Sequence, residues 1–189
     1  MRIVRKKAFE TNSSSCHSLT YVKSNDPMSY LKAWKDKNPN VKTLEVTLKG
    51  YYNDSCACSV KDKLSYIFSD LVNHREDEIV ASVEEVGDPF ANGVSQKSID
   101  AYLTGAFTDI KLNKNKLKNM IAQDERMFRL VKIMKDYAGI DLTFKVGGIG
   151  WIGVDHESVG TGASVMNLTD EEIIEVLFNG NNYFELGAC

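Results

Sequence analysis

Strand-like and helical patterns follow one another along the whole chain, and no pattern repeats with a fixed period. Strands are predicted where β-branched and aromatic residues gather, or where apolar and polar residues alternate. These runs are residues 2–9, 19–23, 41–48, 142–146 and 151–154, with a final edge strand over 183–186. Strands and helices in this order pack most simply as layers around one hydrophobic core. The sequence therefore predicts an α+β fold, with an antiparallel or mixed sheet and helices packed mainly on one face.

The helices are predicted from apolar residues that recur at helical spacing and from residues that begin a helix. One helix follows Asn25-Asp26-Pro27, and a second begins at Ser59. A later helix begins at Thr169, where the Thr-x-x-Glu pattern is a capping box. The longest helical signal covers residues 115–138 and is followed by a glycine. Residues 76–86 fit either a helix or a strand.

Composition and length predict the general class of protein. The chain has 189 residues, of which 43% are hydrophobic and 26% charged, and this predicts a single globular domain over residues 1–189. A net charge of −3 lacks the basic excess that binding to a phosphate backbone needs, so no nucleic-acid partner is expected. No apolar run is long enough to span a bilayer, and the basic start lacks an apolar segment after it. These features predict a cytoplasmic protein without a membrane partner.

The four cysteines are interpreted through that predicted location. Disulfides are rare in the cytoplasm, so Cys16, Cys56, Cys58 and Cys189 are expected to be free thiols, metal ligands or reactive groups. The two thiols of Cys56-Ala57-Cys58 could begin a zinc site, but structural zinc sites show a second ligand pair, which the chain lacks. The favoured prediction is therefore two half-buried thiols before a helix cap, and no metal is assigned.

The segment with the strongest chemical character lies between the first two predicted strands. It reads Phe9-Glu10-Thr11-Asn12-Ser13-Ser14-Ser15-Cys16-His17-Ser18 and is predicted to be a loop. Small hydroxyl side chains allow sharp turns and donate hydrogen bonds to an anion. Histidine is the side chain most easily adjusted to move a proton near neutral pH. We therefore predict that Asn12, Ser13, Ser14 and Ser15 bind a ligand and that His17 takes part in chemistry.

A second polar segment, Asp155-His156-Glu157, follows the predicted strand over residues 151–154. If the terminal strands share one sheet, the two segments meet at one edge and bring His17 and His156 together. In a catalytic reading, His156 is the general base, Asp155 orients it, and His17 is an acid or an electrostatic stabiliser. The alternative is that the serines cap a turn and that both histidines are surface polar residues.

Two further chemistries are weaker alternatives. Cys16 or a serine could act as a nucleophile with a histidine as base, but no glycine-flanked nucleophile elbow surrounds these residues. The glycines of residues 147–153 are followed by a strand-like run rather than a helix, so they do not form a dinucleotide fingerprint. Turns explain these glycines better, and Gly160-Thr161-Gly162 is a candidate flap beside His156.

Several of these segments resemble one family. Arg5, residues 9–15 and His17-Ser18-Leu19 are similar to the N-terminal signature of uncharacterised proteins from tailed phages and prophages of Firmicutes. Later segments of the chain resemble later blocks of those proteins in the same order: Lys63-Leu64-Ser65-Tyr66-Ile67, Asp155-His156-Glu157-Ser158 and Phe178-Asn179-Gly180-Asn181-Asn182.

The resemblance implies one polar centre and a phage origin, but no particular reaction. In that family the position of Cys16 takes various small residues, which weakens the interpretation of this cysteine as a nucleophile or zinc ligand. The polar centre that the resemblance implies comprises Asn12, Ser13, Ser14, Ser15, His17, Asp155, His156 and Ser158. Among these, the resemblance alone adds Ser158 to the predicted ligand-binding residues.

The leading prediction is a phage-type intracellular protein whose polar Ser/His/Asp pocket binds an anionic small molecule such as a nucleotide. Hydrolase or transferase activity would suit such a pocket, and the sequence specifies no cofactor. The rival prediction is a non-catalytic protein that binds and inhibits a host protein, in host takeover or counter-defence. Loop aromatics suit such an interface, and the candidates are Tyr51, Tyr52, Phe90 and Phe107.

Overall fold

The computed structural model describes residues 3–6, 16–51, 56–73, 121–146, 153–154 and 161–187. Within these residues, helices occur together with antiparallel and parallel strand pairs, which confirms the predicted α+β class. The prediction for residues 76–86 lies outside the described residues, and so do Tyr52, Phe90 and Phe107.

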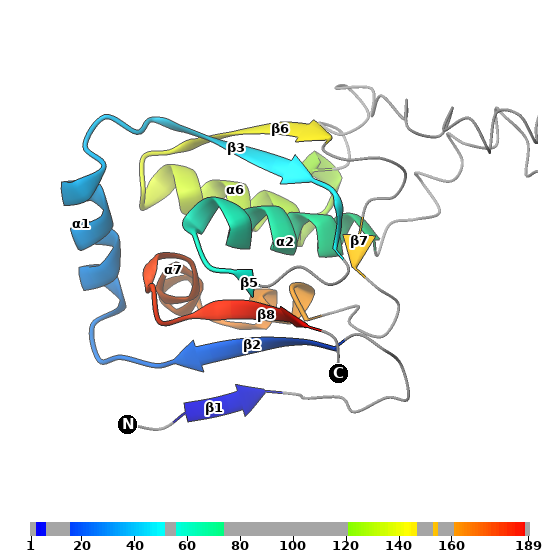
Figure 1. The fold of residues 1–189 in the computed structure, drawn as a ribbon. Helices are drawn as coiled ribbons and strands as arrows, with labels where there is room; N and C mark the ends of the chain where they lie inside the picture. Colours follow the sequence, from blue (N-terminus) through cyan, green and yellow to red (C-terminus); the bar gives the residue numbers. More distant parts are fainter. Residues whose placement is uncertain are drawn as a thin grey trace, which may run out of the picture.

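A four-stranded antiparallel sheet contains strands from both ends of the described chain (Figure 1). Its strand order is β1 (Ile3–Lys6), β2 (Cys16–Val22), β8 (Tyr183–Gly187) and β5 (Cys56–Ala57). The strand near the C-terminus was predicted to be an edge strand, and this is wrong. β8 pairs with β2 on one side and with β5 on the other, and its side chains at two alternate positions, Phe184 and Leu186, are buried in the core.

Two parallel pairs complete the sheet structure. β3 (Thr43–Leu48) pairs with β6 (Asp141–Val146), and β4 (Gly50–Tyr51) pairs with β7 (Gly153–Val154). β3 confirms the strand expected from alternation, because Val46 is completely buried and its neighbours are only partly so. Parallel strands need a long crossover between them, and here helices α2 and α6 lie between β3 and β6 in the sequence.

Most of the helices lie between the four-stranded sheet and the β3–β6 pair (Figure 1). The helical segments are α1 (Pro27–Lys37), α2 (Val60–Asn73), α6 (Glu125–Asp136), the short 3-10 helix η3 (Ala163–Asn167) and α7 (Asp170–Phe178). α2 and α6 lie under the β3–β6 pair, and α7 lies between α2 and the four-stranded sheet. α1 packs against α7 at one end of the molecule.

The predicted helix ends are confirmed where a side chain closes the first turn. Asp26 accepts a hydrogen bond from the backbone N–H of Ser29, and Pro27 is the first residue of α1. Ser59 accepts from the N–H of Asp62 at 3.1 Å. Thr169 forms the complete capping box with Glu172. The strongest local signals in the sequence therefore set the starts of three helices.

The long helix expected over residues 115–138 is interrupted, which corrects that prediction. Residues 121–123 are helical, but a new helix, α6, begins after Asp124. The Asp124 carboxylate accepts from the backbone N–H groups of Arg126 and Met127, so it caps α6 instead of continuing the first helix. The C-terminal signal is confirmed: Gly139 has a φ of 66°, a conformation that glycine adopts without steric cost.

α2 is the central helix of the molecule, and every residue from position 63 to position 72 is buried. Two of its serines contact β3. Ser65 Oγ accepts from the N–H of Thr47 at 3.0 Å, and Ser69 Oγ accepts from the N–H of Lys49 at 3.2 Å. Four residues of helix and two of strand both advance by about 6 Å, so serines one turn apart match alternate N–H groups of an extended chain.

A buried lysine joins α2 to the end of α7. The Lys63 side chain is only 1% exposed, and its Nζ donates to the carbonyl oxygens of Val176, Leu177 and Asn179 at 3.0, 3.2 and 2.9 Å. The last carbonyl groups of a helix lack partners within the helix and carry partial negative charge. Lys63 therefore satisfies these carbonyl groups while its own ammonium group is removed from water.

This burial predicts an unusual pH dependence of stability. Burial lowers the pKa of Lys63 from 10.5 to about 8. Between these values the unfolded chain holds a proton that the folded protein has released, so raising the pH favours folding. We expect the free energy of unfolding to rise by about 2 kcal/mol between pH 7 and pH 10 from this group. Urea denaturation at several pH values measures the slope.

The control for this experiment is Lys63→Met, which removes the titrating group while keeping a long apolar chain. Its free energy of unfolding should lack the rise over the same pH range. Tyr21, whose pKa is raised mainly by burial and then by Glu175, contributes in the opposite direction only above its ordinary value of 10. Equal slopes in the wild type and Lys63→Met would show that Lys63 does not titrate in this way.

Candidate functional site

His17 lies in a strand and not in a loop, which corrects the prediction for residues 16–18. β2 begins at Cys16, and its ladder with β8 pairs Cys16 with Gly187 and His17 with Leu186. The antiparallel ladder therefore extends three residues further toward the N-terminus than the predicted strand over residues 19–23. As a result the backbone of His17 is held by the sheet, and its side chain is buried, with 5% exposure.

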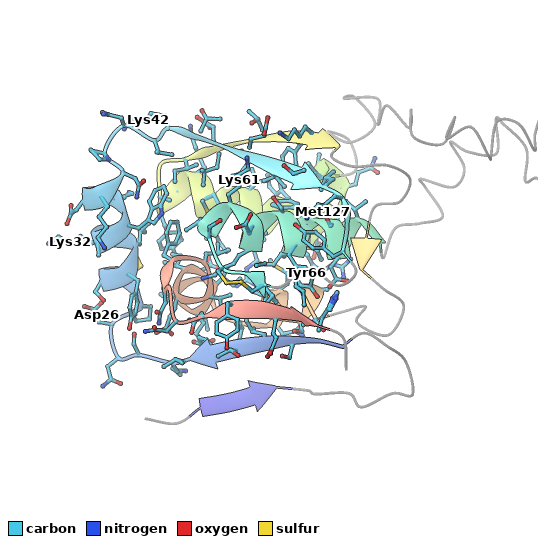
Figure 2. All side chains as sticks on the ribbon, viewed as in Figure 1. Asp26, Lys32, Lys42, Lys61, Tyr66 and Met127 are labelled. Atoms are coloured by element: carbon cyan, nitrogen blue, oxygen red, sulfur yellow. A yellow bond between two sulfur atoms is a disulfide. The ribbon has the colours of Figure 1, made fainter. Side chains whose placement is uncertain are left out.

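The imidazole of His17 contacts the hydroxyl group of Tyr66 from α2. Nδ1 and the Tyr66 Oη are 3.1 Å apart, and the two rings meet edge to face with centroids 5.7 Å apart. Figure 2 labels Tyr66 between α2 and the four-stranded sheet. A hydrogen bond to one ring nitrogen selects the orientation of the imidazole and couples it to the state of the partner. His17 is therefore a positioned histidine and not the surface residue of the structural alternative.

Tyr66 stays a neutral hydroxyl at any pH near neutrality. Its pKa is raised well above 10, first by burial and then by the nearby charge of Asp70, while a hydrogen bond with Thr161 acts in the opposite direction. Since the tyrosine keeps its proton, its hydroxyl group is available for hydrogen bonding near neutral pH. Tyr66 acts as a hydrogen-bond partner for His17.

Thr161 and the two residues after it contact the elements that carry His17 and Tyr66. Thr161 Oγ1 donates to the carbonyl oxygen of His17 at 3.4 Å, and the N–H of Ala163 donates to Asp70 Oδ2 at 2.7 Å. Gly162 permits this close approach, because a Cβ at that position would lie 3.1 Å from the Asp70 side chain and 3.2 Å from the backbone of Ile67. Of the predicted flap over residues 160–162, Thr161 and Gly162 thus pack on β2 and α2, and Gly160 lies outside the described residues.

Aromatic side chains surround the other sides of Tyr66. Tyr51 meets it edge to face with ring centroids 5.2 Å apart, and Phe184 lies at 4.5 Å with the rings tilted by 37°. Tyr51 is 3% exposed, so its proposed place on a protein-binding surface is wrong. Its ring instead completes the core around Tyr66, and Lys49 Nζ lies 4.5 Å from the centroid of the Tyr51 ring.

Most of the predicted site residues lie outside the described residues. These are Asn12, Ser13, Ser14, Ser15, Asp155, His156 and Ser158. The described residues that flank them in sequence are Cys16, at the start of β2, and Val154, at the end of β7. β7 packs on α2, and Val154 is opposite Tyr51 in the parallel ladder. The start of β2, the end of α2 and β7 lie at the same end of the molecule (Figure 1).

Sequence reasoning assigned no functional role to Tyr66 or Asp70. The signal was present in α2, because Tyr66 and Asp70 are four residues apart in a helix that is largely apolar on its buried side. That spacing places two polar side chains on one face of a helix, one turn apart. A carboxylate and a phenol on the buried side of a helix need partners, and the structure shows those partners.

The pair Cys56 and Cys58 is joined by a disulfide, which contradicts the prediction of free, half-buried thiols. Both cysteines are exposed, and only Ala57 between them is buried. Their sulfur atoms are bonded to each other, so in this state they are not thiolate ligands for zinc. Among the described residues, no group of three His, Cys, Asp or Glu side chains is arranged to hold a metal ion.

Comparison with known proteins gives no further assignment. No protein-family model matches the chain, and the search of curated proteins and of solved structures finds no significant match. In the described part of the chain, no helix is long and apolar enough to cross a membrane.

Proposed function

We propose that this is an intracellular, phage-type protein that binds an anionic small molecule, such as a nucleotide, in a polar pocket around His17. The observation that carries the proposal is the hydrogen bond between His17 Nδ1 and the buried hydroxyl of Tyr66. It holds a titratable side chain in one orientation directly after the serine-rich segment of residues 12–15. Such a positioned imidazole can pair with an anion when protonated, and it can move a proton during hydrolysis or group transfer.

The neighbouring groups support this role for His17. Its backbone is held by the β2–β8 ladder and accepts a hydrogen bond from Thr161, so the ring sits on a rigid support. The Asp70 carboxylate, which would repel an anion, accepts a hydrogen bond from the backbone of Ala163. In the proposed pocket, residues 12–15 and Ser158 hold the ligand, and Asp155 and His156 act together with His17.

Ligand binding by variants tests the proposal. Nucleoside mono-, di- and triphosphates and inorganic phosphate are titrated into the full chain by calorimetry, with native mass spectrometry as an independent readout. His17→Gln keeps a polar side chain of similar length but cannot become charged, and we expect it to weaken binding by at least about tenfold. Tyr66→Phe should weaken binding by a smaller factor, because it removes only the group that orients His17.

Tyr183→Phe is the matched control, since Tyr183 is a partly exposed tyrosine on β8 and should bind like the wild type. Circular dichroism must show that each variant is folded. If no phosphorylated compound binds, or if His17→Gln binds as tightly as the wild type, the proposal is wrong. The alternative proposal, inhibition of a host protein in host takeover or counter-defence, would then be the better account.

A further inference from the structure

The disulfide between Cys56 and Cys58 has an unusual position for a bond that holds a fold together. It spans only two positions in the sequence, and both cysteines are exposed (Figure 2 draws the bond between the sulfur atoms). Alternate residues of a strand point to opposite faces, so the buried Ala57 holds β5 in the core while both cysteines lie on the solvent side. A reagent in solution can therefore approach this bond.

The disulfide restrains the chain very little. Cross-linking stabilises a protein mainly by limiting the unfolded chain, and the effect grows with the number of residues in the closed loop. Here the loop contains only Cys56, Ala57 and Cys58, and the first two are already held by the pairing of β5 with Glu185 and Phe184 of β8. The bond is therefore not needed to keep β5 in the sheet.

Its surroundings favour breaking and re-forming the bond. Among the described residues, β5 is at the edge of the four-stranded sheet, and no further described strand of that sheet covers it. Cys58 directly precedes Ser59, which caps the start of α2. The N-terminal end of a helix carries partial positive charge and lowers the pKa of a nearby thiol, which makes its thiolate a better leaving group. Of the two cysteines, Cys58 is therefore the one placed to be the leaving group.

We propose that Cys56 and Cys58 form a thiol–disulfide exchange site that oxidises a dithiol, either a small molecule or a pair of cysteines in a protein. This site uses no residue of the His17 pocket, so it is independent of the proposed function above. An exposed two-cysteine site also agrees with a reducing location, where the disulfides that do occur are usually transient and catalytic or redox-sensing.

The thiol–disulfide exchange takes place in two steps, which together balance in atoms and electrons. A substrate thiolate attacks Cys56 Sγ, the bond between the two cysteines breaks, and Cys58 leaves as a thiolate while substrate and Cys56 form a mixed disulfide. The second substrate thiolate then attacks the substrate sulfur of that mixed disulfide, and Cys56 leaves as a thiolate. The substrate dithiol has lost two electrons and become a disulfide. The protein pair has gained them, and the two substrate protons end on the cysteines or in solvent.

Dithiothreitol is the probe dithiol for the test. The full chain is oxidised with oxidised glutathione, and the glutathione is removed by desalting under anaerobic conditions. Dithiothreitol is then added. The protein thiols present after the reaction are alkylated with maleimide and located by mass spectrometry. We expect one equivalent of dithiothreitol to be oxidised per protein and maleimide to appear on Cys56 and Cys58. The double variant Cys56→Ser/Cys58→Ser should oxidise none. The matched control Cys16→Ser/Cys189→Ser should behave like the wild type.

Three results would overturn the proposal. The pair could fail to form a disulfide with excess oxidised glutathione, or the folded, oxidised protein could resist excess dithiothreitol. As a third result, the double variant Cys56→Ser/Cys58→Ser could lose its cooperative thermal transition. That loss would show that the disulfide is needed for the stability of the fold. A double variant that melts within a few degrees of the wild type and no longer oxidises dithiothreitol supports the exchange site.

Discussion

Replacement of Tyr66 by alanine is expected to lower the free energy of unfolding by about 4 kcal/mol, because the ring is completely buried against Tyr51 and Phe184. The cavity would open at the junction of α2, β4 and β8, where the rings of three elements meet. Tyr66→Phe keeps the ring and removes only the hydroxyl group, which contacts His17 and Thr161. We expect that change to cost about 1 to 2 kcal/mol. Chemical denaturation followed by circular dichroism measures both values.

A double-mutant cycle separates the hydrogen bond from the packing. His17→Phe alone removes the imidazole partner of the Tyr66 hydroxyl, which keeps its hydrogen bond with Thr161, and Tyr66→Phe alone leaves His17 Nδ1 without that hydroxyl. In the double variant the contact between His17 and the Tyr66 hydroxyl is lost only once, so its destabilisation should be smaller than the sum of the two single values. Strict additivity would show that this hydrogen bond contributes nothing to stability. The exposed ring of Phe128 offers a control, since Phe128→Ala should change stability far less than Tyr66→Ala.

A second large loss is expected for Glu175→Ala. The Glu175 carboxylate is completely buried and accepts hydrogen bonds from the Tyr21 hydroxyl at 2.8 Å and from the N–H of Ser24 at 2.6 Å. These contacts join α7 to the end of β2. Alanine would leave both donors without this acceptor inside the protein, and hydrogen bonds to a charged group are stronger than neutral ones. We expect a loss of about 3 to 5 kcal/mol by urea denaturation.

Two further variants test the cause of this loss. Glu175→Gln retains one accepting oxygen, so it should lose about half as much stability as Glu175→Ala. Glu185→Ala is the matched control, because Glu185 is an exposed glutamate on β8, and it should change stability by no more than about 0.5 kcal/mol. A Glu175→Ala variant as stable as this control would show that the buried carboxylate does not hold α7 to β2.

Three helix starts were predicted correctly because each depends on residues within one turn. Asp26, Ser59 and Thr169 close their helices through their own side chains, so the local sequence contains the whole signal. The position of β8 could not be predicted in the same way. A short strand near the end of a chain becomes internal only when a distant segment pairs with it, and that segment is the two-residue strand β5. Nothing in the alternation of residues 183–186 specifies a second neighbour.

In the candidate site, too, one part could be predicted from the sequence and another could not. The chemistry of His17 could be predicted from residue type and from the serines before it, but its partner could not. Tyr66 is 49 residues away in the sequence and lies in a helix whose apolar pattern is explained by the core alone. Only the folded arrangement of the chain, which places Tyr66 of α2 beside His17 of β2, brings the two side chains together. The pairing of Cys56 with Cys58 was missed for a different reason, since the predicted compartment favoured free thiols.

The contacts of Ser65 and Ser69 limit the addition of a further strand at the end of β3. An uncovered strand edge presents N–H and C=O groups to which another chain can add. The N–H groups of Thr47 on β3 and of Lys49 directly after it already donate to serine hydroxyls of α2, so a foreign strand cannot use them without displacing the helix. At this end of β3, strand addition from a partner or from an aggregating copy therefore competes with the contacts of α2.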